Sequence, residues 1–254
     1  MDSELRLICD YRYEKTNIED LYYTPPYKIM HPFMDGKKME LILMSSSAGL
    51  LAGDCFRCNI QVKDRAYLSF LSQSYEKIFD TLEKNASRSV FIQVGSKATL
   101  KYLPLPAIPF ANSSFVANSE IHLEESSTLV YSEVFSCGRV GMGEKFKMRS
   151  FHSKTKVYVV DTLVFADNTL ISPIEMDYEK LGMWGEFSHS GMLYIYCPDS
   201  AESEQELISE IKDIYEKLNI LAGVSKCKKG LLVRSLGHSG DELHNLNTII
   251  ANCI

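Results

Sequence analysis

The sequence predicts a mainly β protein, in which a β-helical, solenoid-like body of stacked sheets precedes a C-terminal β-α-β-β-α portion with two helices. Three observations predict this fold class. Apolar and polar residues alternate in short runs up to about residue 167, as in strands. One pattern recurs three times at a spacing of roughly thirty residues, and the pattern changes from residue 190. We expect one domain over 1–254, with the β body at about 1–189 and the α+β portion at about 190–254.

The repeat consists of IQVKDRAYLSF at 60–70, IQVGSKATLKY at 92–102 and IHLEESSTLVY at 121–131. Each copy has two alternating apolar residues, a polar turn, and then a small residue, a leucine and an aromatic residue at alternate positions, which places this triad on one face of a strand. Two short strands cannot bury their own apolar face, so we expect successive copies to stack about 4.8 Å apart around a shared core. A sandwich with look-alike hairpins is the alternative.

Stacking predicts that the segments following the three copies meet at one edge of the body. These segments are 71–79, 103–110 and 132–146. They carry a set of polar and charged residues that we expect to gather beside prolines and aromatic rings: Gln73, Lys77, Glu133, Arg139 and Glu144. An ion-pair network that ties one repeat to the next would explain the two glutamates and the arginine equally well.

The C-terminal portion begins with SGMLYIYC, which predicts a strand that ends at Pro198. The next segment predicts a helix with Asp199 or Ser200 as its N-cap and acidic residues in its first turn. Its apolar face would consist of Leu207, Ile211, Ile214, Tyr215 and Leu218. A glycine-bounded hairpin at 223–237 follows, and a last helix starts near Gly240 and Asp241. That helix would bury one stripe: Leu243, Leu246, Ile250 and Cys253. We expect this unit to pack on the β body.

The stretch SSSAGLLAGDCFRC at 45–58 combines a run of small residues with a CxxC pair. A phosphate loop needs a lysine and then Ser or Thr after its glycines, whereas Asp54 follows Gly53 here. Cysteines three apart on a strand point to opposite faces, so Cys58 is expected in the core, and a redox or metal site at Cys55 and Cys58 is the less favoured alternative. The small residues predict a tight turn, a bulge or the close approach of another backbone.

The composition excludes several classes of protein. With 27 basic and 33 acidic residues, a net charge of -6 and no basic stripe, the chain is not expected to bind nucleic acid. It has no run of about 20 apolar residues and no signal peptide, so we expect a cytoplasmic protein without a membrane partner. Seven cysteines do not suit a secreted disulfide scaffold, and most are expected to be reduced and buried. No GxSxG motif or histidine pair supports catalysis or a closed metal site.

Four stretches, in this order and at these intervals, resemble the UreD family of urease accessory proteins, called UreH in Helicobacter. They are SSSAGLLAGD at 45–54, QSYEKIF at 73–79, PLPAIPFANSSF at 104–115 and YSEVFSCGRVGMGEKF at 131–146. The similarity covers nearly the whole chain. Ala48 and Ala52 stand at positions that are usually glycine in the family, and Leu71-Ser72 replaces a common Thr-Thr.

This resemblance implies a noncatalytic scaffold for maturation of the urease metallocentre. Such a scaffold binds UreF, recruits the GTPase UreG through it and docks on the urease apoenzyme, in an expected 2:2 assembly with UreF. No cofactor would be held tightly, and Ni²⁺ would be bound only in transit through an internal tunnel, where weakly holding oxygen ligands suit it. Matched residue by residue, the family motifs give these tunnel or support residues: Asp54, Gln73, Lys77, Glu133, Arg139 and Glu144.

The alternative function is that of a β-solenoid enzyme acting on a polysaccharide. In such an enzyme Glu133 and Glu144 would face a groove as the acid and base of glycoside hydrolysis. The sequence offers no aromatic-lined groove for a glycan, so this reading ranks below the accessory protein.

Overall fold

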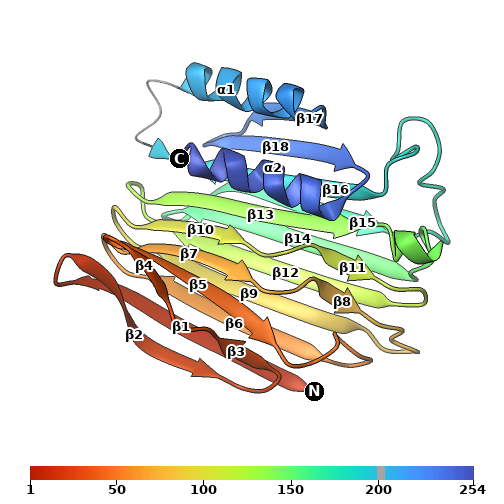
Figure 1. Ribbon diagram of the computed structural model, residues 1–254, viewed down its shortest axis with the longest axis horizontal. Helices are drawn as coiled ribbons and strands as arrows, with labels where there is room; N and C mark the ends of the chain where they lie inside the picture. Colours follow the sequence, from red (N-terminus) through yellow and green to blue (C-terminus); the bar gives the residue numbers. More distant parts are fainter. Residues whose placement is uncertain (199–203) are drawn as a thin grey trace.

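The computed structural model describes residues 1–198 and 204–254, which form two facing sheets (Figure 1). The first sheet has the strand order β15-β14-β12-β9-β6-β1-β2. Its strands are β1 (Asp2–Arg12), β2 (Lys15–Tyr23), β6 (Cys55–Val62), β9 (Ala86–Val94), β12 (Ser114–Leu123), β14 (Ser150–Val159) and β15 (Thr162–Ile171).

The second sheet has the main order β17-β18-β16-β13-β10-β7-β5-β3, with three short strands attached beside it. The strands of the main order are β3 (Tyr27–Ile29), β5 (Lys38–Ser45), β7 (Tyr67–Ser72), β10 (Thr99–Leu103), β13 (Thr128–Ser136), β16 (His189–Tyr196), β17 (Leu221–Lys226) and β18 (Leu231–Gly237). The attached strands are β4 (Phe33–Asp35), β8 (Glu76–Ile78) and β11 (Ala107–Pro109).

The two sheets are the walls of a β-solenoid of about four turns. In the first sheet β1, β6, β9, β12 and β14 are parallel neighbours. In the second sheet β5, β7, β10 and β13 are parallel neighbours. Each turn of the chain therefore adds one strand to each wall. This confirms the predicted fold class and excludes a sandwich of hairpins, whose neighbouring strands would be antiparallel.

The three repeats lie in register, as their pattern predicts. Ile60, Ile92 and Ile121 are aligned across the first sheet. In the second sheet the aromatic rings stack, with centroids 5.5 Å apart for one pair and 5.3 Å for the next. The leucines and aromatic residues of the triads are all buried: Leu68, Leu100, Leu129, Phe70, Tyr102 and Tyr131.

Antiparallel strands close the parallel ladders of both walls. At the N-terminal end, β2 pairs with β1, while β3 and β4 pair with β5. At the opposite end, β15 pairs with β14 and β16 pairs with β13. These strands satisfy the backbone groups that the outermost parallel strands would otherwise leave unpaired.

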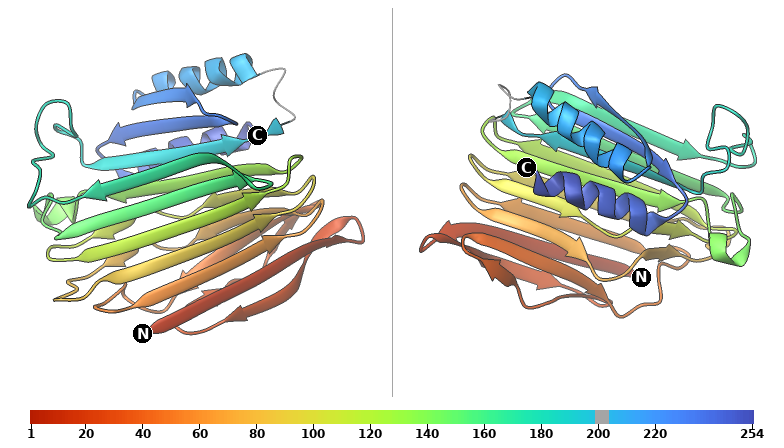
Figure 2. Two further views of the ribbon diagram at one scale, coloured as in Figure 1. Left: turned by 180° about the vertical axis from the view of Figure 1, so that it is seen from behind. Right: turned by 45° about the horizontal axis from the view of Figure 1, so that its top comes forward.

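The C-terminal portion has the predicted β-α-β-β-α order, with α1 (Glu204–Lys217) and α2 (Gly240–Asn252). Its strands do not form a separate unit packed on the body. Instead β16 pairs antiparallel with β13, and β18 and β17 follow, so the second sheet continues through this portion. The reason is that β13 presents an open edge whose hydrogen-bonding groups β16 can satisfy. Figure 2 shows both helices on the outer side of that sheet.

The helix boundaries change two of the expected apolar faces. The predicted N-cap at Asp199 or Ser200 lies outside the described residues. In α1, Leu207 and Ile211 are buried as expected, whereas Leu218 follows the end of the helix and is 38% exposed. In α2, Ser239 is the N-cap and accepts a hydrogen bond from the amide of Glu242. Cys253 follows this helix and is exposed. The predictions that Leu218 and Cys253 belong to the apolar faces of the two helices are therefore wrong.

Three of the seven cysteines are buried, namely Cys9, Cys58 and Cys137. The expectation that most would be buried is therefore wrong. In the described part of the chain, neither helix is long and apolar enough to cross a membrane.

Shortening one repeat leucine should destabilise the whole solenoid. Leu100 is fully buried in the middle of the stack, so we expect Leu100→Ala to lower the free energy of unfolding by about 2–5 kcal/mol. Leu163→Ala, at a position of β15 that is 43% exposed, is the matched control and should change it by less than about 1 kcal/mol. Urea denaturation measures both, and equal losses would contradict a core built on the repeats.

Candidate functional site

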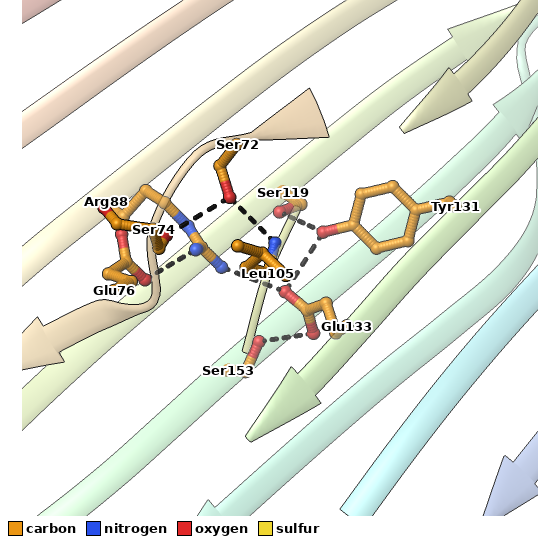
Figure 3. A network of polar contacts seen from close by, with 9 residues as sticks. All are labelled: Ser72, Ser74, Glu76, Arg88, Leu105, Ser119, Tyr131, Glu133 and Ser153. Atoms are coloured by element: carbon orange, nitrogen blue, oxygen red, sulfur yellow. Dashed lines mark hydrogen bonds and ion pairs between the residues drawn. The ribbon is translucent and has the colours of Figure 1, made fainter. Parts of the chain in front are cut away.

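A buried arginine lies between the two walls of the solenoid. Arg88 occupies an inward position of β9 and is 9% exposed. Its Nη1 donates to Glu76 Oε2 at 2.6 Å, and its Nη2 donates to Glu133 Oε1 at 3.3 Å (Figure 3). Glu76 belongs to β8 and Glu133 to β13, so the guanidinium of the first sheet joins two carboxylates of the second.

Glu133 is held by further polar groups of both walls. Ser153 Oγ donates to Glu133 Oε2 at 2.9 Å. The Tyr131 hydroxyl lies 3.0 Å from Glu133 Oε1 and 2.7 Å from Ser119 Oγ. Burial, followed by the nearby charge of Glu133, raises the pKa of Tyr131 well above its ordinary value, which keeps this hydroxyl protonated.

The charges of the ion-pair network influence one another. Burial raises the pKa of Glu76, an effect that Arg88 partly opposes and Glu133 reinforces. Burial alone would lower the pKa of Arg88, but the carboxylates, Glu76 foremost, more than offset this and raise it, so the guanidinium stays charged. A buried positive charge thus stands between two carboxylates that compete for it.

Polar side chains continue from Glu133 to the C-terminal end of the solenoid. Ser153 of β14 is the register partner of Thr169 on β15, and Thr169 Oγ1 donates to Asp167 Oδ2 at 2.9 Å. Asp167 forms an ion pair with Arg234 of β18, across the two walls. We call the whole set the axial row: Glu76, Arg88, Ser119, Tyr131, Glu133, Ser153, Thr155, Asp167, Thr169 and Arg234.

The axial row separates two hydrophobic clusters of the interior. Along β9, Ala86 belongs to one cluster, Arg88 to the row and Val90 to the other cluster. The same order recurs on β12 and β14, where apolar residues flank Ser119 on one strand and Ser153 and Thr155 on the other. Among the described residues, Arg88 Nε and Thr155 Oγ1 are buried atoms of this row without a hydrogen-bond partner.

A cavity lies at each end of the axial row. The N-terminal cavity, of about 410 Å³, has Glu76 and Arg88 in its wall together with the small-residue run around Gly49. The C-terminal cavity, of about 520 Å³, is lined by Arg234, by β17 and by the segment around Met183. The N-terminal cavity therefore lies beside Arg88 at one end of the row, and the C-terminal cavity lies beside Arg234 at the other end.

The small-residue run forms part of the N-terminal cavity because another strand passes close to it. The amide of Leu50 donates to the carbonyl of Lys77 at 2.8 Å, and Leu50 makes a parallel bridge with Ile78 of β8. A Cβ atom on Gly49 would lie 2.4 Å from the carbonyl oxygen of Lys77. The expected close approach of another backbone is thus confirmed.

The three segments predicted to share an edge do so, since β8 pairs with β11 and β11 pairs with β13. Their charged side chains nevertheless divide into separate groups. Glu133 points between the walls, whereas Gln73 and Lys77 are exposed. Asp54 lines the N-terminal cavity and accepts a hydrogen bond from the amide of Leu51 at 2.8 Å.

The two remaining predicted residues form a pair of their own on the loop after β13. Arg139 Nε donates to Glu144 Oε2 at 2.8 Å, and this carboxylate also accepts from the amide of Ala111 at 3.3 Å. The guanidinium carbon of Arg139 lies 4.4 Å from the centroid of the Phe110 ring. The pair thus ties the loop after β13 to the segment after β11, as an ion-pair network between repeats would.

Most residues of the axial row were not predicted from the sequence. Only Glu133 was among the expected residues, while Glu76, Arg88, Ser153, Asp167 and the others were not. A signal for some of them is present in the sequence: in ASRSVFIQV an arginine, and in SFVANSEIHL a serine, falls in the apolar phase of the alternation. A polar residue at such a position is placed inside and needs a partner there.

The CxxC pair has the geometry that its strand predicts. Cys58 is buried on the inner face of β6, and Cys55 is partly exposed. Burial raises the pKa of Cys58 to about 12, so its thiol remains protonated at neutral pH and is a poor metal ligand or redox nucleophile. Within residues 1–198 and 204–254, no group of three or more His, Cys, Asp or Glu side chains is placed to hold a metal ion.

Comparison with known proteins gives a match over almost the whole chain. The family model described as UreD urease accessory protein matches residues 1–253. Urease accessory protein UreD of Acetivibrio thermocellus is 35% identical over 244 residues, covering 94% of this chain and 92% of the relative. Urease accessory protein UreH of Helicobacter hepaticus is 34% identical over 229 residues, covering 90% and 88%. UreD of Flavobacterium johnsoniae is 30% identical over 249 residues, covering 96% and 89%.

The Arg139–Glu144 pair should make stability depend on acidity. Hydrogen bonding from Arg139 lowers the pKa of Glu144 below its ordinary value of about 4.3. The carboxylate therefore stabilises the fold above that value, and this contribution is lost as the pH falls through the lowered pKa. In urea denaturation from about pH 7 to about pH 3, Glu144→Gln should lose stability less steeply than the wild type at the acid end.

Glu83→Gln, at an exposed position, is the matched control and should follow the wild type. A wild-type advantage over Glu144→Gln that stays constant across the whole range would contradict the ion pair.

Proposed function

The chain belongs to the UreD urease accessory protein family, whose members are noncatalytic, and we propose that it serves urease as a scaffold through which nickel is delivered. The observation that supports this most strongly is the axial row, a set of polar side chains that lies between the two apolar clusters of the solenoid and ends at the half-exposed Arg234, with a cavity beside each end. A buried polar row is costly for a fold that needs only stability, so its length calls for a function.

The chemistry of the axial row suits a divalent cation in transit. It offers the carboxylates of Glu76, Glu133 and Asp167, and hydroxyl oxygens stand between them. Because these ligands are spread along the row, only one or two of them can contact a cation at any one position. The cation is therefore bound weakly at each position and can move on to the next. We propose that Ni²⁺ moves along this row between the N-terminal and C-terminal cavities. Asp54 lies in the wall of the first cavity, where its carboxylate is bonded to the Met1 ammonium and to the amide of Leu51.

Exposed apolar residues flank the cavities, which supports docking of partner proteins at the ends of the row. Leu51, in the wall of the N-terminal cavity, is 55% exposed. Beside the C-terminal cavity, the segment 172–188 between β15 and β16 stands away from the sheets (Figure 2). It carries four exposed apolar side chains: Ile174, Met176, Leu181 and Met183.

Aromatic contacts fix the shape of this segment. The ring of Tyr178 stacks on Phe146 with centroids 5.3 Å apart, and Trp184 packs against Phe146 and Phe135. The amide of Trp184 donates to the carbonyl of Tyr178 at 3.0 Å. A segment held in place at two aromatic residues, with exposed apolar side chains before and between them, has the character of a docking surface.

We propose UreF as the partner at the C-terminal cavity, with UreG recruited through UreF and the urease apoenzyme at the opposite end. The complex would hold two copies each of this chain and UreF, which multi-angle light scattering measures. The reading as a polysaccharide-active enzyme has no support in the geometry. Glu133 lies between the walls and Glu144 is paired on a loop, so they do not face a common groove.

A charge on the docking segment should weaken the complex with UreF. Leu181 is fully exposed, and a carboxylate there would have to be desolvated on binding, so we expect Leu181→Asp to weaken binding by about tenfold or more. Leu82→Asp, on the exposed loop between β8 and β9, is the matched control and should bind like the wild type. Co-purification and calorimetric titration measure both. Unchanged binding by Leu181→Asp would contradict the proposal that UreF binds at this surface.

Changes within the axial row should slow nickel delivery and leave the complex intact. In a reconstituted system of apo-urease, UreF, UreG, GTP and Ni²⁺, we expect Glu133→Gln to reduce the rate of urease activation several-fold. Glu144→Gln, which changes a glutamate outside the row, should activate urease like the wild type. Co-purification with UreF checks that both variants assemble. Equal activation by the two variants would argue against a passage along the row.

A further inference from the structure

We propose that the guanidinium of Arg88 occupies the place of a divalent cation between Glu76 and Glu133, and that an entering cation binds there only by displacing it toward the N-terminal cavity. This inference rests on the proposed function, because it concerns how that function is controlled. In this proposal the charge of Arg88 takes the place of the cation, and Arg88 blocks the axial row as long as no cation is supplied.

The position of Arg88 in the row supports this assignment. Its guanidinium bonds both carboxylates at once, at 2.6 Å and 3.3 Å, and so takes up the oxygens that a cation would use. The side chain also lines the N-terminal cavity, which gives it room to move aside. As long as it remains between the two carboxylates, its charge repels any second cation in the row.

Two buried atoms of the axial row lack the partners that a purely structural network would supply. Arg88 Nε has no hydrogen-bond partner among the described residues, although the side chain is nine-tenths buried. Thr155 Oγ1, on a fully buried residue next to Ser119 in the ladder, also has none. An unpartnered buried oxygen and an incompletely bonded guanidinium point to a second arrangement, in which a ligand completes the set.

Charge balance favours an exchange over simple addition. With Arg88 in place, two carboxylates face one positive charge. If the guanidinium swings into the cavity and a divalent cation takes its place, two carboxylates face two positive charges and are fully compensated, whereas simple addition of the cation would leave an excess positive charge. If the guanidinium leaves and nothing replaces it, two buried carboxylates stand without a counter-charge, which is strongly unfavourable. Departure of the arginine and arrival of the cation are therefore coupled.

The test replaces Arg88 with methionine, an uncharged and unbranched side chain. In metal-free buffer, the full chain with Arg88→Met should unfold at a lower temperature than the wild type, because Glu76 and Glu133 are left uncompensated. Ni²⁺ or Mn²⁺ should restore its melting temperature and should shift that of the wild type little. Equilibrium dialysis should show one Ni²⁺ per chain, bound at least about tenfold more tightly by the variant than by the wild type.

Two control variants identify the site. Glu76→Gln combined with Arg88→Met removes one of the uncompensated charges, so this double variant should regain stability in metal-free buffer and lose most of the added Ni²⁺ affinity. Arg57→Met removes an arginine from the exposed face of β6 and should bind Ni²⁺ like the wild type. If Arg88→Met folds only in the presence of metal, that result by itself meets the prediction, provided that the double variant folds without metal.

Ni²⁺ affinities that are equal in the wild type and Arg88→Met would overturn the proposal, and so would a gain that survives Glu76→Gln. These measurements use the purified chain and need no urease. Loss of the proposed function would show instead as nickel activation of urease that does not depend on this chain. The two failures can therefore be told apart.

Discussion

The parallel register of the repeats is the constraint on which the other features of this structure depend. Because Ile60, Ile92 and Ile121 are aligned, every inward position of one turn lies beside the equivalent position of the next. Apolar positions therefore merge into clusters, and some polar positions also meet, since Ser119 lies beside Thr155 and Ser153 lies beside Thr169. Arg88 is level with Phe56 and Ala117, so its long side chain, and not its register position, brings its guanidinium into the row. A slip of one residue in any strand would turn its inward side chains outward and interrupt both. The same register that builds the core thus also aligns part of the row, and the ion pairs of Arg88 complete it.

Hydrogen bonding allows this polar row to exist inside the fold. A charged group removed from water is tolerated when it is paired and bonded, and Arg88 meets two carboxylates while Glu133 also receives Ser153 and lies near Tyr131. Such an arrangement is no more stable than an apolar one of equal volume. Stability alone therefore does not account for the row, in agreement with the proposed function.

The sequence predicted the stacking of turns well, because its period and its alternation depend only on local spacing. The location of the charged site was harder to predict. The segments that follow the repeats do meet at one edge, yet Arg139 and Glu144 pair with each other there and Gln73 and Lys77 are exposed. The pairing of Arg88 with Glu133 depends on how two walls face each other, which no periodicity within one strand determines. The pairing of β16 with β13 was equally hard to predict, because it depends on which strand edge of the sheet is open in the folded protein.

The strands that close the ladders also set a length. A solenoid can gain or lose whole turns, and each turn separates its neighbours by about 4.8 Å. Because antiparallel partners terminate the ladders on both sides, the span between the two hollows comes only in steps of one turn and cannot vary continuously. If partner proteins dock beside both cavities, as proposed, the number of turns sets the distance between them, and a pair of partners fitted to this distance would not fit a body one turn longer or shorter.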